Sequence, residues 1–173
     1  MTGPMTGMHL GIPLSIDAAD QENQAFFRFC GAGEFRLQRC ERCDLLRYPP
    51  STGCPYCGAP RSSWVPVEPS GAVFTYADVP HAIQPAFRDY VPYLIVIVQL
   101  DTQTGQPGPD DGIRVAGNLV TPDAAFADPD LIACVGIGSR MRMVFRPVGD
   151  GFALPMWTLD EGVPQPQPWR YPG

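Results

Sequence analysis

The sequence predicts a mainly β protein in which an N-terminal helix precedes a four-cysteine metal ribbon and a small five-stranded barrel. Two closely spaced cysteine pairs predict the ribbon, because such pairs bind a single metal ion. Five short apolar segments separated by turn-forming residues predict the barrel. The 21 prolines and 18 glycines among the 173 residues argue against long helices. We expect the following order: disordered N-terminus 1–14, helix 15–33, ribbon 34–66, barrel 67–158 and proline-rich tail 159–173.

The helix is expected to follow residues 1–14, a segment with no sustained hydrophobic period. Ser15 or Asp17 is predicted to cap it, and the acidic residues of its first turn suit the positive end of the helix dipole. The helix should end near Cys30, because Gly31 and Gly33 can adopt the left-handed conformation that terminates helices. Its aromatic residues cannot all lie on one buried stripe, so they pack on the ribbon or contact a partner protein or an acyl chain. These are Phe26, Phe27 and Phe29.

The metal ligands are predicted from the spacing of two Cys-x-x-Cys pairs, which places two sulfurs of each pair on one ion in a tight turn. Ten residues separate the inner cysteines, enough for a short hairpin. Gly58 follows the second pair, where the backbone often needs a conformation that glycine adopts without strain. Alternating segments at 34–39 and 45–48 are expected to be the strands that flank the first turn, and 59–66 a link to the barrel. The predicted ligands are Cys40, Cys43, Cys54 and Cys57.

Zinc is the metal expected in this rubredoxin-like zinc ribbon, although iron is possible because rubredoxins use the same ligands. Four cysteine ligands leave no position for water, so the metal should be structural. The alternative of two disulfides requires an oxidising compartment. The first eight residues do not have the pattern of a secretory signal, and no apolar run approaches the ~18 residues of a membrane span. A cytoplasmic location is therefore expected.

The barrel is predicted from five strand-like segments within residues 72–157. Turn-rich sequences separate them, and the segment 101–112 is expected to be an extended hairpin loop. Residues 122–134 are too long for a turn and predict a short helix between the third and fourth strands, which is where a five-stranded OB-fold barrel carries one. The predicted strands are 72–78, 93–100, 113–120, 140–145 and 152–157.

Charge is unevenly distributed along the chain. The net charge is −3 in residues 1–27, +3 in residues 28–61 and −6 in residues 62–173. An overall charge of −6 argues against nucleic-acid binding, which depends on phosphate contacts. The basic ribbon suits an anionic ligand such as the phosphates of coenzyme A, or an acidic partner surface. Contacts with a partner or with coenzyme A are predicted for Phe26, Phe27, Arg36, Arg39, Arg47 and His81.

Few residues could catalyse a reaction without help from another protein. Every basic residue is an arginine, so lysine chemistry is excluded. The two cysteines outside the metal set, Cys30 and Cys134, are expected to be buried apolar residues. His9 falls in the segment expected to be disordered, and His81 lies in a loop. No glycine-rich phosphate loop or Gly-x-Ser-x-Gly motif is present.

The order of helix, ribbon and barrel over residues 17–157 resembles the zinc-ribbon plus OB-fold, acyl-CoA-associated proteins of domain of unknown function 35. The segments that carry the resemblance include both cysteine pairs and several flanking motifs. The flanking motifs are Asn23-Gln24-Ala25-Phe26-Phe27, Leu37-Gln38-Arg39, Tyr48-Pro49-Pro50, Gly71-Ala72-Val73-Phe74-Thr75-Tyr76, Gly117-Asn118-Leu119-Val120 and Phe152-Ala153-Leu154-Pro155. The loop 101–112 and the proline-rich tail depart from the family pattern.

The resemblance implies a non-catalytic accessory subunit in a hetero-oligomer with a thiolase-superfamily enzyme, such as a lipid-transfer-type thiolase or aldolase. Such partners act on acyl-CoA thioesters, including those of steroid side chains and aromatic degradation. The OB-fold subunit then helps to form the coenzyme A passage or to keep its partner soluble and active. Three alternatives are a partner of a hot-dog-fold enoyl-CoA hydratase, a free-standing module that binds single-stranded nucleic acid, and an iron-loaded electron carrier.

Overall fold

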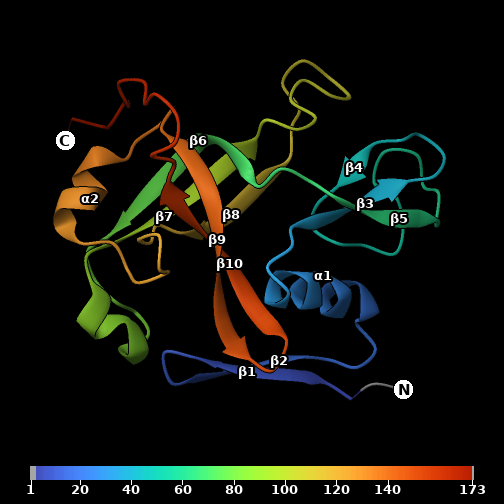
Figure 1. The fold of residues 1–173 in the computed structure, drawn as a ribbon, viewed down its shortest axis with the longest axis horizontal. Helices are drawn as coiled ribbons and strands as arrows, with labels where there is room; N and C mark the ends of the chain where they lie inside the picture. The colour runs from blue at the N-terminus through green and yellow to red at the C-terminus, as the bar shows by residue number, and fades with distance from the viewer. Residues whose placement is uncertain (1–2, 173) are drawn as a thin grey trace. The chain divides into compact units, whose positions relative to one another are not determined.

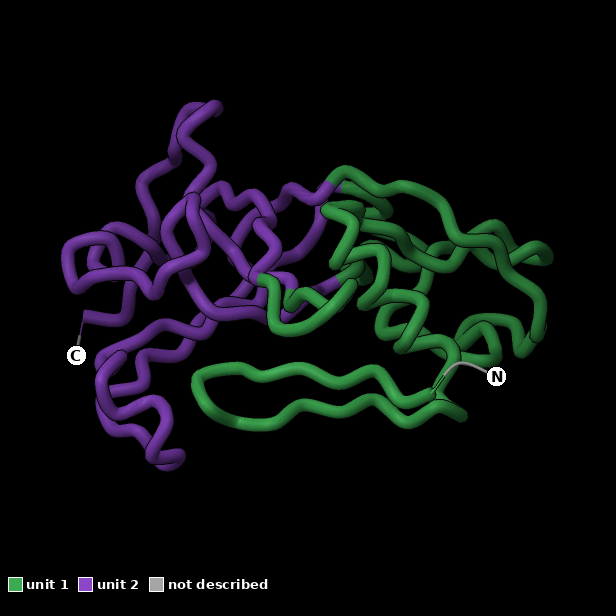
Figure 2. The backbone as a smooth tube through the Cα atoms, turned by 60° about the horizontal axis from the view of Figure 1, so that its bottom comes forward, with its two compact units in different colours: residues 1–68, 102–113, 147–154 green, residues 69–101, 114–146, 155–173 purple. Residues whose placement is uncertain are grey.

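The computed structural model describes residues 3–172, which form two compact units (Figure 2). The first unit comprises residues 1–68, 102–113 and 147–154, and it contains the ribbon. The second comprises residues 69–101, 114–146 and 155–173, and it contains most of the barrel. The division passes through two strands of the barrel sheet and through one of its loops, so neither unit is a single stretch of chain.

The N-terminal segment is an ordered hairpin, and the prediction of disorder is wrong for residues 3–14. Strands β1 (Met5–His9) and β2 (Ile12–Ile16) pair antiparallel from Met5↔Ile16 to His9↔Ile12. Met5 is buried in the first unit with Val148 and Phe152. The five-residue strands are too short, and too rich in Met and Gly, to have a recognisable period of their own. Distant residues supply the contacts that order them, and His9 is buried instead of lying in a disordered start. Residues 1 and 2 lie outside the described part of the chain.

Helix α1 (Gln21–Gly31) begins later than predicted. Asp20 caps it by accepting a hydrogen bond of 3.1 Å from the backbone N–H of Asn23. Ser15 cannot be the cap because it belongs to β2, and the Asp17 carboxylate accepts instead from Ala19 N–H in the turn before the helix. The helix ends one residue beyond the predicted Cys30, and Gly33, at φ 75°, then turns the chain.

The ribbon is a three-stranded antiparallel sheet with the order β4-β3-β5. Strands β3 (Arg36–Cys40) and β4 (Leu46–Arg47) flank the first cysteine turn, as predicted. Residues 59–66 contain a third strand, β5 (Ser62–Pro66), where only a link was expected. It pairs with β3 from Arg36↔Pro66 to Cys40↔Ser62.

The three phenylalanines of α1 are all in contact with other parts of the first unit. Phe26 is 1% exposed, and its ring lies 5.7 Å from that of Tyr48. Phe27 packs at 5.3 Å on Phe152, and Phe29 packs at 5.4 Å on Trp64 of β5. Packing within the chain therefore accounts for the aromatic side chains that a single helix stripe could not bury.

The five predicted barrel strands are all present in one sheet with the order β10-β9-β6-β7-β8 (Figure 1). Their bounds are β6 (Ser70–Val79), β7 (Tyr93–Leu100), β8 (Arg114–Asn118), β9 (Arg140–Gly149) and β10 (Phe152–Leu159). A parallel bridge between Leu119 and Trp157 joins the two edges within the second unit, and the strand order of the described residues is otherwise open. Trp157 is fully buried and donates a hydrogen bond of 3.1 Å from Nε1 to the Val115 carbonyl.

Two short helices lie in the loops of the barrel sheet. Helix α2 (Pro129–Cys134), between β8 and β9, is the predicted one, and Asp128 caps it through Leu131 N–H. The 3-10 helix η1 (Pro85–Tyr90), between β6 and β7, was not predicted. Its aromatic residues pack with the start of β7 and with the β8–α2 loop, contacts that have no local sequence pattern. The cluster comprises Phe87, Tyr90, Tyr93 and Phe126.

The loop between β7 and β8 contacts the ribbon, and its residues 102–113 belong to the first unit. The Gln103 side chain accepts from Leu46 N–H at 2.6 Å and donates to the Leu46 carbonyl at 2.9 Å. On the β3 side of β4, Leu45 O accepts instead from Cys40 N–H. One side-chain amide thus satisfies both outward-facing polar groups of Leu46.

The C-terminal segment is tied to the second unit. Trp169 and Ile137 exchange backbone hydrogen bonds of 2.8 and 3.0 Å. Arg170 donates from Nη2 to both carboxylate oxygens of Asp78, at 2.8 and 3.1 Å, and from Nη1 to the Ile132 and Val135 carbonyls at the end of α2. The prolines of this segment give no core-forming pattern, yet backbone and guanidinium contacts fix its course.

Candidate metal centre

The four cysteines of the ribbon converge on one point. Their sulfur atoms all lie within 4.8 Å of one another, and the Cys40–Cys57 and Cys43–Cys54 pairs are each 3.6 Å apart. A zinc ion with four bonds of about 2.3 Å to sulfur separates its ligands by about 3.8 Å. The sulfurs are far beyond the ~2.05 Å of a disulfide bond. The geometry therefore fits a tetrahedral metal site and excludes paired disulfides in this arrangement.

Both cysteine turns are built in the same way. Asp44, directly after the first pair, has φ 63° and donates its N–H to Cys40 O at 3.0 Å. Gly58, directly after the second pair, has φ 71° and donates to Cys54 O at 2.9 Å. In each turn, the residue with the left-handed backbone conformation reverses the direction of the chain after the second cysteine. The conformation predicted for Gly58 is confirmed, and Asp44 does the same in the first turn.

Backbone amides favour the thiolate form of Cys40, whereas the net effect at Cys43 is the opposite. The N–H groups of Cys43 and Arg42 are directed at the Cys40 sulfur and lower the pKa of this thiol to about 6. The N–H of Leu45 lowers the pKa of Cys43, but burial and the neighbouring sulfurs outweigh it and raise this pKa to about 12. Four thiolates this close repel one another, so a cation is needed to keep all of them ionised. When bound, the metal would cross-link two turns and offer no open position for water or substrate.

A buried polar network supports the ribbon behind the metal turns. Gln38 of β3 donates from Nε2 to Glu22 of α1 at 2.7 Å, and its Oε1 accepts from Arg47 Nε at 3.0 Å. Arg47 Nη2 donates to Ser62 Oγ at 2.9 Å, whereas Nη1 is buried without a hydrogen-bond partner in the described residues. Arg47 is 1% exposed, so the prediction that it contacts a partner or coenzyme A is wrong. An alternating strand gave no sign that Gln38 would point inward.

The other predicted contact residues are not brought together. Phe26 is as deeply buried as Arg47 and is not available on the surface, whereas Phe27 is half-buried. Arg36 pairs with Glu34 and lies over the Phe29 ring at 5.2 Å, and Arg39 is 3.5 Å from Asp44. His81 is exposed in the β6–β7 loop of the second unit. Contacts of Phe27, Arg36, Arg39 and His81 with a partner or with coenzyme A stay predictions.

The cysteines outside the metal set differ from each other. Cys30 is buried in α1, and this burial raises the pKa of its thiol to about 12, which disfavours the nucleophilic thiolate. Cys134 is exposed at the end of α2, although it was expected to be buried. Its short helix turns the apolar sequence around it so that Ile132 faces the core instead.

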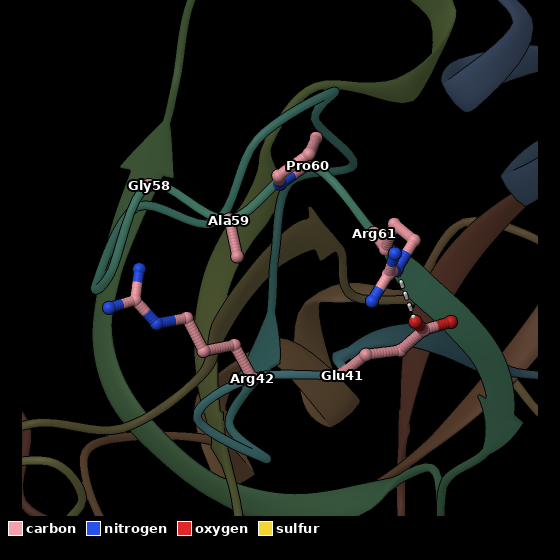
Figure 3. A pocket seen from close by; sticks show the side chains of 6 residues that line it. All are labelled: Glu41, Arg42, Gly58, Ala59, Pro60 and Arg61. Atoms are coloured by element: carbon pink, nitrogen blue, oxygen red, sulfur yellow. Dashed lines mark hydrogen bonds and ion pairs between the residues drawn. The ribbon is translucent and has the colours of Figure 1, made fainter.

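A hollow of about 620 Å³ lies beside the metal turns (Figure 3). Its lining comes from the first turn, at Glu41 and Arg42, and from the segment 58–61 that follows the second turn. Glu41 N–H donates to the Arg61 carbonyl at 3.2 Å, and this backbone bond joins the two segments. Cys54 N–H donates to the Ala59 carbonyl at 2.9 Å and closes the second turn. Among the described residues, no helix is long and apolar enough to cross a membrane.

Comparison with protein families gives two adjacent matches. Residues 29–62 match the ChsH2 rubredoxin-like zinc ribbon domain, and residues 64–146 match the ChsH2 C-terminal OB-fold domain. A probable enoyl-CoA hydratase alpha subunit of Thermomonospora curvata is 32% identical over 105 residues, which is 60% of this chain and 29% of that protein. The chain thus spans less than a third of the length of this curated relative.

Comparison with solved structures gives two similar chains. The structure titled Ltp2-ChsH2(DUF35) aldolase contains a chain that matches with a TM-score of 0.63 and 26% identity, over 83% of this chain and 98% of that one. A DUF35-family protein of unknown function from Sulfolobus solfataricus aligns with a TM-score of 0.48 and 12% identity, over 82% of this chain and 87% of that one. The chain belongs to the ChsH2/DUF35 family, whose members join a rubredoxin-like zinc ribbon to a C-terminal OB-fold domain.

Proposed function

We propose that this chain is a non-catalytic accessory subunit that docks on a thiolase-superfamily aldolase and helps to form or stabilise the active complex. The substrates are acyl-CoA thioesters, with those of steroid side chains or of aromatic degradation as the expected classes, held at the interface of the two proteins. The observation that carries the proposal is the match along 98% of a chain from the Ltp2-ChsH2(DUF35) aldolase.

The chemistry of the described residues supports an accessory role. Four of the six cysteines form the metal set, and a tetrathiolate site has no open coordination position. Cys30 is buried with a raised pKa, and His9 is buried in β1. This leaves the exposed Cys134 and His81, and no nucleophile, base and oxyanion donors gathered at one place in residues 3–172.

The outer face of the barrel sheet counts against a nucleic-acid-binding module. The strand register places Thr75 and Ala77 of β6 beside Ile97 and Ile95 of β7, opposite the buried face of these strands. In OB folds that bind oligonucleotides, this face carries much of the binding surface. On β8 the same face contributes Arg114, Ala116 and Asn118. A surface with one cation among these residues is poorly suited to phosphate backbones.

We propose zinc as the resident metal, because the rubredoxin-like match is to a zinc ribbon and the sulfur geometry fits. Elemental analysis of the purified protein tests this directly. One zinc ion per chain and a colourless protein are expected. Visible absorption from iron bound to thiolates would instead favour an electron carrier.

Co-expression tests the proposed function. The chain is produced with a candidate thiolase-like aldolase, and the complex is analysed by size-exclusion chromatography with light scattering and by acyl-CoA cleavage. We expect a stable hetero-oligomer whose aldolase activity exceeds that of the partner alone, and no turnover by the isolated chain. Turnover by the isolated chain, or failure to bind any such partner, contradicts the proposal.

The name of the Thermomonospora relative supports a second candidate partner, an enoyl-CoA hydratase of the hot-dog fold. The same co-expression with a hot-dog-fold protein, assayed by hydration of an enoyl-CoA, distinguishes the two. A complex with the hydratase alone would replace the aldolase as the partner.

A further inference from the structure

The arginines of residues 28–61 differ in how many of their guanidinium donors make hydrogen bonds. Arg28 donates to Gln24, and Arg47 is buried in the polar network. The guanidinium groups of Arg36 and Arg39 pair with Glu34 and Asp44. Each of these four arginines makes at least one side-chain hydrogen bond within the first unit.

Arg42 and Arg61 line the same hollow beside the metal turns. The Arg42 side chain is exposed and makes no hydrogen bond or ion pair with any of residues 3–172. Arg61 pairs through Nε with Glu41 at 2.9 Å, which leaves both of its Nη groups without a partner in the same residues. Its side chain is 83% exposed. Two exposed arginines with unused guanidinium donors therefore lie at one hollow of the ribbon.

The shape of the hollow sets these donors on two sides of an apolar surface. Figure 3 shows Arg42 on one side, Arg61 and Glu41 on the other, and Ala59 and Pro60 between them. The Glu41 carboxylate faces Arg61 Nε and so fixes this side chain at the rim. The volume of the hollow, about 620 Å³, lies within the ~300–1,000 Å³ usual for small-molecule sites.

We propose that this hollow binds the phosphate groups of a coenzyme A thioester. Guanidinium groups bind phosphate oxygens through paired, charge-assisted hydrogen bonds, and the two arginines are set apart, as an extended ligand with several phosphates requires. Residues 28–61 carry a net charge of +3 within a chain of net charge −6, so an anion is drawn to the ribbon and repelled by the rest.

The inference rests on the proposed function, which supplies the ligand class. In a coenzyme A thioester the phosphates lie at the opposite end of the molecule from the reacting acyl group. An accessory subunit can therefore hold the phosphates while a partner carries out the chemistry. The metal set organises the two turns that present Arg42 and the 58–61 segment, which gives the ribbon a role in ligand binding without any role in catalysis.

Calorimetric titration of the metal-loaded full chain tests the site at low ionic strength. The probes are coenzyme A, dephospho-coenzyme A, which lacks the 3′-phosphate, and pantetheine, which lacks all phosphates. We expect affinity to fall in this order, with no measurable binding of pantetheine, and to weaken as salt is added. Inorganic phosphate and 3′,5′-ADP serve as competitors that distinguish recognition of phosphate from recognition of the whole cofactor.

The double variant Arg42→Ala/Arg61→Ala should bind coenzyme A at least about tenfold more weakly, since each lost charge-assisted contact reduces affinity several-fold. Arg88→Ala is the matched control, because this exposed arginine lies in η1 of the second unit and should leave the affinity unchanged. Metal content and thermal melting of both variants verify that the ribbon is intact.

Three outcomes overturn the site: no coenzyme A binding by the unaltered chain, equal binding of pantetheine, or unchanged affinity in the double variant. These outcomes are separable from failure of the proposed function. If the double variant forms the aldolase complex and binds coenzyme A with unchanged affinity, only the proposed site is wrong. If coenzyme A binds through these arginines but no partner is found, the site stands and the accessory role fails.

Discussion

The ribbon and the barrel are both small β structures, but different interactions stabilise them. The barrel strands contain 5 to 10 residues and bury apolar side chains such as Leu94, Val96 and Trp157 completely. The ribbon strands contain 2 to 5 residues, and the side chains buried there include the polar Gln38 and Arg47. The barrel is therefore stabilised mainly by an apolar core, whereas the ribbon combines a few buried apolar side chains with its four sulfurs and a polar network. This difference predicts which changes affect one region and spare the other.

Loss of a metal ligand should have the largest effect and should separate the two regions. Cys40→Ser removes one of four sulfurs, and structural zinc in such turns contributes roughly 10–16 kcal/mol to folding. We expect loss of metal and rapid hydrogen exchange in β3, while the amides of β7 stay protected. Cys134→Ser, outside the metal set, is the control. Full metal content with an unchanged melting curve in Cys40→Ser would contradict the metal site.

Truncation of the barrel core should give the reverse pattern. Trp157→Ala removes a fully buried indole and leaves the Val115 carbonyl without its donor, so we expect a loss of about 3–5 kcal/mol in the free energy of unfolding. Urea denaturation measures the loss, and elemental analysis should show undiminished metal content. Metal loss in this variant would mean that the ribbon does not fold independently of the barrel core.

Removal of the Gln103 amide should affect the ribbon edge more locally. Gln103→Ala deletes two hydrogen bonds to Leu46, and we expect a loss of about 1–3 kcal/mol and faster exchange of the Leu46 amide proton. Gln103→Glu retains an acceptor for Leu46 N–H but no donor for its carbonyl, so this proton should stay better protected than in the alanine variant. Equal exchange rates in all three proteins would show that the contact is absent in solution.

The smallest expected effect is electrostatic and lies in the second unit. Two hydrogen bonds from Arg140 are the main reason why the pKa of Asp101 is lowered, and Asp101 is half exposed, so Asp101→Asn should cost less than about 1 kcal/mol at neutral pH. A lowered folded-state pKa stabilises the fold above the unfolded value of about 3.9, and this contribution is lost as the pH falls below it. Denaturation at several pH values should show the two proteins converging in acid. A difference that is constant with pH would assign the effect to packing instead.

Prediction from sequence succeeded where the pattern is local. The spacing of the cysteine pairs specifies a metal site without reference to distant residues, and Gly58 could be assigned its conformation from its position alone. The apolar run of β7 lies between clear turn signals, so its bounds were predicted to the residue. In these segments, residues within a few positions of one another determine the structure.

Prediction failed where contacts between distant residues determine the structure. The β1–β2 hairpin is ordered by packing against Val148 and Phe152, which lie more than 130 positions away. The sequence of the hairpin itself has no hydrophobic period that would predict its strands. Arg47 was assigned to the surface by its charge, but Gln38 and Ser62 provide the partners that allow its burial. Arg42 was not among the predicted contact residues, because only the absence of side-chain hydrogen bonds within the described residues distinguishes it from the other ribbon arginines.

The contact between Gln103 and Leu46 also bears on how the protein behaves at high concentration. Unpaired N–H and C=O groups along the outer strand of a sheet are a template on which a second molecule can add its own strand. The β7–β8 loop places a side chain at this position and so blocks the first step of strand addition. This contact is thus expected to disfavour self-association of the ribbon through the outer edge of β4.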